Sequence, residues 1–364
     1  MRPNNKKHRL ITEKLFPSTL PIRDAFGIAF FYLLLAASSL LLPSCNTTEP
    51  PIDNIKPGRR DYTWKVDTLF IPSTYLFKMW GNSPSDVWAV GPGGSLDKTI
   101  WHYDGNKWKT DGVSRSINPW TIYGFSADNV WIAGEEGRIW HYNGTKWSQN
   151  LWYKNSHFSE TDFLDIWGES PNDIYAVGLA DSSNIRLGLM LHYNGNNWKR
   201  VNIGFIKGIL MKIRKGSKPN SKYFLWNQIQ NNSADSTKYF IFENNKPTEI
   251  YHHIGARYFL TVINNEVIFT FDNEAYTYSN NTFNLIAKNP YPNNYTGVYG
   301  RSVKDIIWMM ADGLTHFNGS DFKYILKFND LSLSDGAVFN NDIFFLANNF
   351  NNSLNNLIYH GILK

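Results

Sequence analysis

The sequence predicts an all-β fold, a β-propeller of seven four-stranded blades. A phrase of the form Trp-Gly-x-Ser-x-x-Asp-Val-Trp-Ala-Val-Gly begins at Trp80, and related phrases begin at Tyr123, Trp167 and Tyr299. The glycines at their second position are 43, 44 and 132 residues apart, and the last interval leaves room for two degenerate copies. A period in the forties that is built of short strands is typical of propeller blades. Because propellers host both binding modules and enzymes, this architecture leaves the function open.

The clearest repeat predicts how one blade is built. Its apolar and β-branched runs predict strands over residues 119–126, 129–133, 138–142 and 145–151, from the inner to the outer edge. Gly134–Gly137 is expected to turn between the second and third strands. Asn143-Gly144 is the strongest two-residue hairpin signal, because both residue types tolerate positive φ.

Projection of the period along the chain predicts how the ring closes. It places blades near residues 73–116, 117–160, 161–204, 205–250, 251–290, 294–329 and 331–364. Six or eight blades stay open as alternatives, because the fourth and fifth blades are poorly marked. The last unit has room for three strands only, whereas Asp61–Phe70 resembles an outer strand and precedes the first inner strand. We therefore expect Asp61–Phe70 to complete the seventh blade, which removes exposed sheet edges.

Two polar residue types recur at fixed positions of the repeat. Histidines precede a Tyr or Phe in the third strands, at His102, His141, His192 and His316. They are expected to be structural, because copies one blade apart face different seams and cannot converge on a metal. Aspartates precede the second strands, at Asp86, Asp128, Asp173 and Asp305, where they are expected to cap backbone amides of the turn.

Residues 1–44 have the pattern of an export signal. Six basic residues stand against two acidic ones, and an uncharged run then extends over 17 residues, from Phe26 to Leu42. A spanning helix needs about 20 apolar residues, so this run is short for one. The alternative is an uncleaved N-terminal anchor helix.

The run ends at Leu42-Pro43-Ser44-Cys45, which resembles the lipobox of bacterial lipoproteins. The resemblance implies that Cys45 is lipidated on its thiol, by chains such as palmitate, and becomes the new N-terminus of a membrane-anchored protein. Two or more acyl chains anchor a protein stably. Asn46 favours the outer membrane by the same analogy, and the polar residues 45–60, with three prolines, are expected to form a tether ahead of a propeller over 61–364.

Composition excludes several kinds of function. When the signal's six basic and two acidic residues are removed, the formal net charge of +5 falls to +1, so no electrostatic footprint for nucleic acid remains. The single cysteine excludes an internal disulfide and zinc sites built on cysteine pairs. We expect no cofactor, no metal and a monomeric protein.

With both patterns in view, the mature chain resembles exported bacterial lipoproteins that carry a kelch-like or galactose-oxidase-like propeller. The resemblance implies recognition as the common role. The chain departs from related enzymes, because no cysteine follows Cys45 to form the Tyr–Cys crosslink of galactose oxidase. Sialidase Asp-boxes place Thr-Trp after the glycine, where this chain has Pro92, Glu135 and Leu179.

These patterns favour a recognition module for a glycan, a peptide or an envelope protein, with its site on one rim of the ring. That rim is expected to carry the blade-to-blade connections and the loops Gly91–Lys98, Leu179–Leu187, Asn227–Thr237 and Asn348–Asn356. Candidate ligand-binding residues are Trp120, Glu135, Glu136, Arg138, Asp181 and Arg186. Candidate aromatic platforms for carbohydrate are Trp120, Trp152, Tyr153 and Tyr295.

Other functions remain open at this stage. A glycan hydrolase or lyase would need two carboxylates, or a His with a Tyr or Arg, at the channel mouth. An assembly scaffold of the cell envelope would need an exposed apolar patch. The loops could also be solvated spacers without a ligand.

Overall fold

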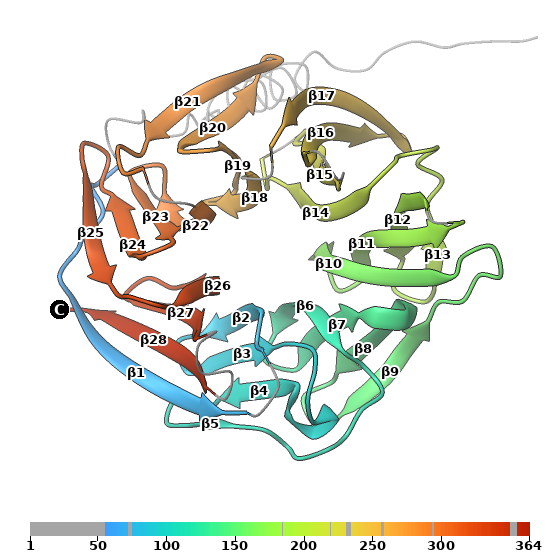
Figure 1. Cartoon of the computed structure of the whole chain (residues 1–364), viewed down its shortest axis with the longest axis horizontal. Helices are drawn as coiled ribbons and strands as arrows, with labels where there is room; N and C mark the ends of the chain where they lie inside the picture. The colour runs from blue at the N-terminus through green and yellow to red at the C-terminus, as the bar shows by residue number, and fades with distance from the viewer. Residues whose placement is uncertain are drawn as a thin grey trace, which may run out of the picture. The chain divides into compact units, whose positions relative to one another are not determined.

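Seven antiparallel sheets of four strands each are arranged in a ring (Figure 1). This computed structural model describes residues 55–71, 75–183, 185–218, 220–230, 234–255, 258–292, 295–349 and 355–364. Residues 55–364 form one compact unit. The predicted all-β propeller with seven four-stranded blades is therefore confirmed.

The first four blades follow the chain in order, each from its inner to its outer strand. Blade 1 contains β2 (Lys78–Ser83), β3 (Asp86–Val90), β4 (Ile100–Tyr103) and β5 (Trp108–Lys109). Blade 2 contains β6 (Pro119–Ser126), β7 (Asn129–Gly134), β8 (Arg138–Tyr142) and β9 (Trp147–Trp152). Blade 3 contains β10 (Glu160–Ser170), β11 (Asp173–Ser182), β12 (Ile185–Tyr193) and β13 (Trp198–Arg200). Blade 4 contains β14 (Ile209–Lys215), β15 (Tyr223–Ile229), β16 (Ser236–Glu243) and β17 (Lys246–Ile254).

The last three blades complete the ring. Blade 5 contains β18 (Tyr258–Ile263), β19 (Glu266–Phe271), β20 (Glu274–Ser279) and β21 (Thr282–Lys288). Blade 6 contains β22 (Tyr295–Ser302), β23 (Asp305–Met310), β24 (Gly313–Phe317) and β25 (Phe322–Lys327). Blade 7 contains β26 (Ser332–Val338), β27 (Asp342–Asn348), β28 (Asn355–Leu363) and β1 (Tyr62–Phe70). Short 3-10 turns lie at η2 (Leu96–Lys98) and η3 (Glu135–Gly137).

The periodic blade boundaries are correct where the repeat is well kept and wrong where it is degenerate. In blade 2 the inner and third strands match the predicted ranges, and the outer strand begins two residues later, at Trp147. In blade 4 the outer strand β17 runs to Ile254, past the projected boundary at residue 250. Blade 4 has no glycine at the second position of the phrase, the residue that sets the period in blades 1, 2, 3 and 6.

The N-terminal strand closes the ring, as predicted. β1 pairs antiparallel with β28 along its whole length, from Tyr62 opposite Leu363 to Phe70 opposite Asn355. Leu69 is 5% exposed and packs in one cluster with Ile71, Leu76 and Ile358. The two ends of the described chain therefore share one sheet and one core.

The recurrent histidines have structural roles. The recurrent aspartates were expected to cap amides of the turn, but three of them bond these histidines instead. Nε2 of His102 lies 2.7 Å from Oδ1 of Asp86, and equivalent contacts join His192 to Asp173 and His316 to Asp305. In blade 2, His141 instead contacts Asn129, while Asp128 accepts a bond from Ser126. A further pair, His360 with Asp342, occurs in blade 7. These carboxylates thus link the second and third strands of a blade rather than capping turn amides.

Each of four histidine rings also stacks on the residue opposite it in the second strand. Ring centroids of Trp88 and His102 are 4.0 Å apart, and the other three stacks pair Trp131 with His141, Tyr175 with His192 and Phe344 with His360. The hydrogen bond and the ring stack hold each histidine in one orientation, which explains why the repeat retains His at this position.

The Asn143-Gly144 turn differs from the predicted two-residue hairpin. Only the glycine adopts positive φ, at 88°. Tyr142 pairs with Trp147, so four residues connect the strands, and Oδ1 of Asn143 accepts bonds from the amides of Thr145 and Lys146. The asparagine therefore stabilises this turn by capping it with its side chain.

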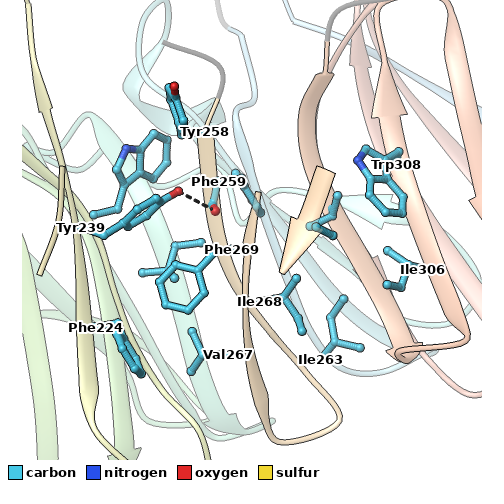
Figure 2. Close-up of a cluster of buried hydrophobic side chains, with 14 of the residues drawn as sticks. Phe224, Tyr239, Tyr258, Phe259, Ile263, Val267, Ile268, Phe269, Ile306 and Trp308 are labelled. Atoms are coloured by element: carbon cyan, nitrogen blue, oxygen red, sulfur yellow. Dashed lines mark hydrogen bonds between the residues drawn. The ribbon is translucent and has the colours of Figure 1, made fainter. Parts of the chain in front are cut away.

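Aromatic side chains fill the seams between blades, as expected from their abundance. In the cluster between blades 4, 5 and 6, the Phe224 ring lies edge-on to Phe269 with centroids 5.1 Å apart (Figure 2). The buried Tyr239 hydroxyl donates a 3.0 Å hydrogen bond to the carbonyl of Phe259 in the next blade. Rings that bury large areas across each seam can hold the blades together without disulfides.

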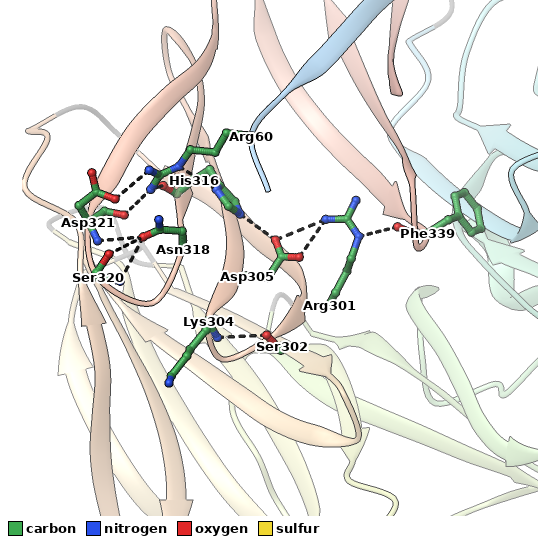
Figure 3. A network of polar contacts seen from close by, with 10 residues as sticks. All are labelled: Arg60, Arg301, Ser302, Lys304, Asp305, His316, Asn318, Ser320, Asp321 and Phe339. Carbon is green, nitrogen blue, oxygen red and sulfur yellow. Dashed lines mark hydrogen bonds and ion pairs between the residues drawn. The ribbon is translucent and has the colours of Figure 1, made fainter. Parts of the chain in front are cut away.

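Residues ahead of β1 contact blade 6. The amide of Gly58 donates a 2.9 Å bond to the carbonyl of Lys304, and Arg60 contacts His316 and Asp321 (Figure 3). Farther along the same network, Arg301 binds Asp305. The N-terminal segment thus joins two blades, since β1 itself belongs to blade 7.

The expected signal peptide and Cys45 lie outside the described residues. Within the described part of the chain, no helix has the length and apolar character needed to cross a membrane.

Candidate functional site

A cleft of about 610 Å³ opens between blades 2 and 3 on the rim that carries the blade-to-blade connections. One wall is the η3 turn between β7 and β8. The other wall is formed by the end of β9, the connection that follows it and the first residues of β10. The seam between two rigid blades therefore presents two irregular segments to one space, which is where propeller loops can bind a partner.

Four carboxylates line this cleft: Glu135, Glu136, Glu160 and Asp162. Burial, followed by the charges of Glu160 and Glu135, raises the pKa of Asp162 to about 6. The amide of Glu136 donates a 3.1 Å bond to Oδ1 of Asp162 and partly opposes this shift. Of the lining residues, only Lys154 is basic, so the cleft carries an excess of negative charge.

Aromatic side chains also line the cleft, on the wall that carries Glu160 and Asp162. Trp152, Tyr153 and Phe158 line the cleft, and Trp152 is 42% exposed. Two cations lie over the Trp152 ring: Cζ of Arg138 is 3.9 Å from the centroid and Nζ of Lys154 is 3.4 Å from it. The Trp152 surface therefore already accommodates an ammonium group supplied by the chain itself.

The backbone of η3 fixes the positions of the two glutamates. Glu136 adopts positive φ, at 55°, which is uncommon for a residue other than glycine. Gly137 follows with a φ of 66°, and a Cβ there would lie 2.5 Å from the carbonyl oxygen of Tyr153. The Gly137 carbonyl accepts a 2.8 Å bond from the Tyr153 amide, so this tight turn holds the two walls together.

Three of the six predicted ligand-binding residues lie at this cleft. Glu135 and Glu136 line it, and Oε2 of Glu135 accepts a 2.7 Å bond from Asn118. Arg138 borders it, since its guanidinium bonds Oε2 of Glu136 and stacks on Trp152. Of the four candidate platforms, Trp152 and Tyr153 also line the cleft.

The other three predicted residues lie elsewhere. Trp120 stacks on Phe77 of blade 1, with ring centroids 5.7 Å apart. The expected loop Leu179–Leu187 is mostly strand, because β11 and β12 extend to Ser182 and from Ile185, and Asp181 pairs with Arg186 in register. Arg186 hydrogen-bonds Gln230 on blade 4, and the Asp181 carbonyl accepts a bond from the cleft residue Ser159. The Tyr295 side chain lies outside the described part of the structure.

Sequence reasoning missed Lys154, Phe158, Glu160 and Asp162, which all line the cleft. The projected boundary between blades 2 and 3 falls at residue 160, and the sequence predicts no site residue between Tyr153 and Asp181. The available signal was the alternation Glu160-x-Asp162 at the end of a blade-to-blade connection, on the rim that also carries Glu135.

No set of three or more His, Cys, Asp or Glu side chains among the described residues is placed to hold a metal ion.

Comparisons with known proteins agree on the fold. No protein-family model matches the sequence, and neither does any curated protein. Solved propellers do match. A WD40 β-propeller domain of Doa1 has a TM-score of 0.60 at 10% identity, with 83% of this chain and 98% of that chain covered. YCF48 bound to D1 peptide has a TM-score of 0.56 at 14% identity, with coverages of 84% and 99%.

A third similar structure is the extracellular domain of the putative one-component system BT4673 from B. thetaiotaomicron. Its TM-score is 0.56 at 10% identity, and the match covers 82% of this chain and 40% of that one. The chain is a β-propeller. At these identities the likeness shows the fold alone.

Proposed function

We propose that this propeller is a recognition module that binds a basic segment of a peptide or protein in the cleft between blades 2 and 3. The observation that carries the proposal is the pairing of the four carboxylates with Trp152, over which Lys154 already places an ammonium group. A lysine or arginine of a ligand would find the same ring and nearby carboxylates. YCF48, which has this fold, was solved with a bound peptide, and that precedent is compatible with the proposal.

The experiment is a binding titration of the purified protein with fluorescent peptides of three kinds: lysine- or arginine-containing, acidic and uncharged. We expect basic peptides to bind and acidic ones not to bind. Glu135→Gln and Glu160→Gln should each weaken binding, by about 3- to 10-fold. Glu249→Gln is the matched control, because Glu249 pairs with Lys238 on the outer part of blade 4. Equal binding of all three peptides, or equal losses in the control, would contradict the proposal.

Glycan cleavage is a second candidate function, favoured by one observation. The pKa of Asp162, raised by burial and neighbouring carboxylates to about 6, suits a general acid. We rank it second because a sugar would displace the cations Arg138 and Lys154 from the Trp152 ring without replacing their charge, whereas a lysine or arginine of a peptide replaces one cation by another. Release of reducing ends from peptidoglycan or oligosaccharide fragments, abolished by Asp162→Asn, would establish it, and absence of product would remove it.

Membrane anchoring through Cys45 is part of the same proposal and rests on the lipobox-like Leu42-Pro43-Ser44-Cys45. In this proposal, the lipidated, monomeric protein presents its cleft outside the cytoplasm, from the outer membrane, to a peptide or envelope protein. Labelled palmitate should be incorporated by the wild-type protein and not by Cys45→Ala. Unchanged incorporation in Cys45→Ala would refute lipidation at this residue.

A further inference from the structure

One residue position recurs on the inner strands, which surround the ring axis (Figure 1). In five blades it directly follows a bulge, and its occupants are Thr121, Asp165, Lys212, Gly297 and Asp335. In blade 1 the register shift lies farther along, between Gly81 and Ser83, and Lys78 occupies the position by its register opposite Val90. We call this position the axial layer.

The two aspartates of the axial layer have complete sets of partners. Each accepts a bond from an amide of the next blade: Asp165 from Ile213 at 3.1 Å and Asp335 from Met79 at 2.9 Å. Asp165 also binds the guanidinium of Arg214, and Asp335 accepts a bond from the hydroxyl of Tyr299. Their carboxylates are therefore committed to holding neighbouring blades together.

Lys212 occupies the same position in blade 4 without an anionic partner. It is 7% exposed, and its Nζ lies 3.6 Å from the centroid of the Phe259 ring in blade 5. Within the described part of the chain, neither Lys212 nor Lys78 forms an ion pair. Burial, followed by the charges of Lys78 and Arg214, lowers the pKa of Lys212, while Asp165 and Asp335 oppose the shift.

A buried ammonium group without a counter-ion is costly, because burial removes its hydration and leaves the charge uncompensated. The contact with the Phe259 ring offsets only part of this cost. The axial layer therefore has two cations that are not paired and two carboxylates that are already occupied. An anion would complete this arrangement.

We propose that the ring axis binds an anionic group, a carboxylate or a phosphate, beside Lys212, with Lys78 of the same layer adding positive charge. This site is separate from the cleft between blades 2 and 3, and it does not depend on the function proposed for that cleft. The group recognised could be a free anion or the terminal carboxylate of a peptide, since both present the same chemistry to an ammonium group.

The first test measures thermal unfolding of the whole protein in inorganic phosphate, with sodium chloride added to keep ionic strength constant. At ten times the dissociation constant, we expect phosphate to raise the Tm of the wild type by about 2 °C. Lys212→Met should abolish this shift. Lys238→Met, on the surface of blade 4, should retain it. No shift in the wild type, or the same shift in Lys212→Met, would overturn the proposal.

The second test needs no variant, so it remains decisive even when Lys212→Met does not fold. Lysines of the wild type are reductively methylated in the presence and absence of phosphate or acetate, and the modified positions are mapped by mass spectrometry. Either anion should lower methylation of Lys212 at least 3-fold and leave Lys238 unchanged. Equal methylation of Lys212 in all conditions would refute the site. The same test is then run with one peptide in two forms, with a free C-terminus and with an amidated one. Protection of Lys212 by the free form alone would identify the terminal carboxylate of a peptide as the source of the anion.

Discussion

Nε of Arg60 donates a 3.1 Å hydrogen bond to Nδ1 of His316, across two segments that are 256 residues apart in the chain. Nδ1 of His316 must therefore be the acceptor, so the ring proton lies on Nε2, which contacts Oδ1 of Asp305 at 2.7 Å. The Arg60 guanidinium also bonds the carboxylate and the carbonyl oxygen of Asp321 (Figure 3). The segment ahead of β1 is thus fixed to blade 6 by a directional network.

We predict that Arg60→Ala lowers the free energy of unfolding by about 2 kcal/mol, because it removes hydrogen bonds to a charged group and to a buried histidine. Arg59→Ala is the matched control. Arg59 pairs with Asp61 and bonds the carbonyl of Lys364, but the Arg59 and Asp61 side chains are 52% and 46% exposed, so its loss should have a much smaller effect. Urea unfolding measures both values. Equal effects of the two substitutions would show that the network adds no stability beyond a surface ion pair.

Because β1 closes the ring, a substitution that leaves a small cavity beside it should lower the stability of the whole ring. Leu69→Ala should lower stability by about 2–4 kcal/mol, because Leu69 is 5% exposed within the core shared with blade 7. Val66→Ala, at a residue that is 48% exposed in the same strand, should cost under about 1 kcal/mol. Calorimetry should show one transition at lower temperature for Leu69→Ala. A separate early transition with the main one unchanged would mean that β1 does not stabilise the ring as a whole.

The glycines that end the repeated phrase show why the propeller and the boundaries of its well-kept blades could be predicted from the sequence. A Cβ on Gly91, Gly134 or Gly178 would lie 1.9 Å from a backbone carbonyl oxygen near the start of the inner strand, that of Tyr75, Asn118 or Asp162 respectively. The same backbone contact therefore restricts the same position in three blades, and such a restriction is visible as a repeat. Blades 4 and 5 lack this contact, and there the projected boundary at residue 250 was wrong.

The cleft was only half predictable for a related reason. Glu135 directly follows Gly134, the last residue of the repeated phrase, so its place on the rim could be predicted. Glu160 and Asp162 lie after an irregular connection whose length the repeat does not fix. Asp181 and Arg186 were expected in a loop because Ser182-Ser183-Asn184 is polar. In the structure the flanking residues pair as strands, since Leu179 and Leu189 are buried on the blade. Side-chain burial across strands decided that result, and it is not visible in local composition.

The close backbone contact at the glycines that end the phrase gives a third prediction. Gly134 has a φ of −175°, which any residue can adopt, so it is the overlap with the backbone of Asn118 and Pro119 that opposes a side chain there. Gly134→Ala should therefore cost about 3 kcal/mol through displacement of the backbone. Gly112→Ala is the control, because Gly112 has a φ of 69° but no atom within 4 Å of a Cβ, and should cost about 1 kcal/mol. Urea unfolding compares the two, and a larger loss in Gly112→Ala would contradict this explanation.

Asp305 should contribute to stability in a pH-dependent way. Burial opposes its ionisation, yet the hydrogen bond from His316 and the charge of Arg301 outweigh burial and lower the pKa of Asp305. Because the folded-state pKa lies below the unfolded value of about 3.9, this contribution is present above that value and is lost as pH falls through the folded pKa. Asp305→Asn should thus be less stable at pH 7 and lose less stability between pH 5 and pH 3. Asp128→Asn is the control, because Asp128 bonds Ser126 and not a histidine, and its loss of stability between pH 5 and pH 3 should equal that of the wild type.

Binding of a basic peptide in the cleft should weaken in acid. The pKa of Asp162 is raised by burial and by Glu160 to about 6, so below this pH the carboxyl is protonated and attracts a cation less. A bound cation favours the ionised carboxylate, so the complex releases a proton near pH 6, and affinity should fall about 3- to 10-fold from pH 7.5 to pH 5. Asp162→Asn should bind more weakly at pH 7.5 and lose most of this pH dependence. Titrations in two buffers of different ionisation enthalpy would detect the released proton. An affinity that stays constant from pH 7.5 to pH 5 would show that Asp162 does not face the ligand's charge.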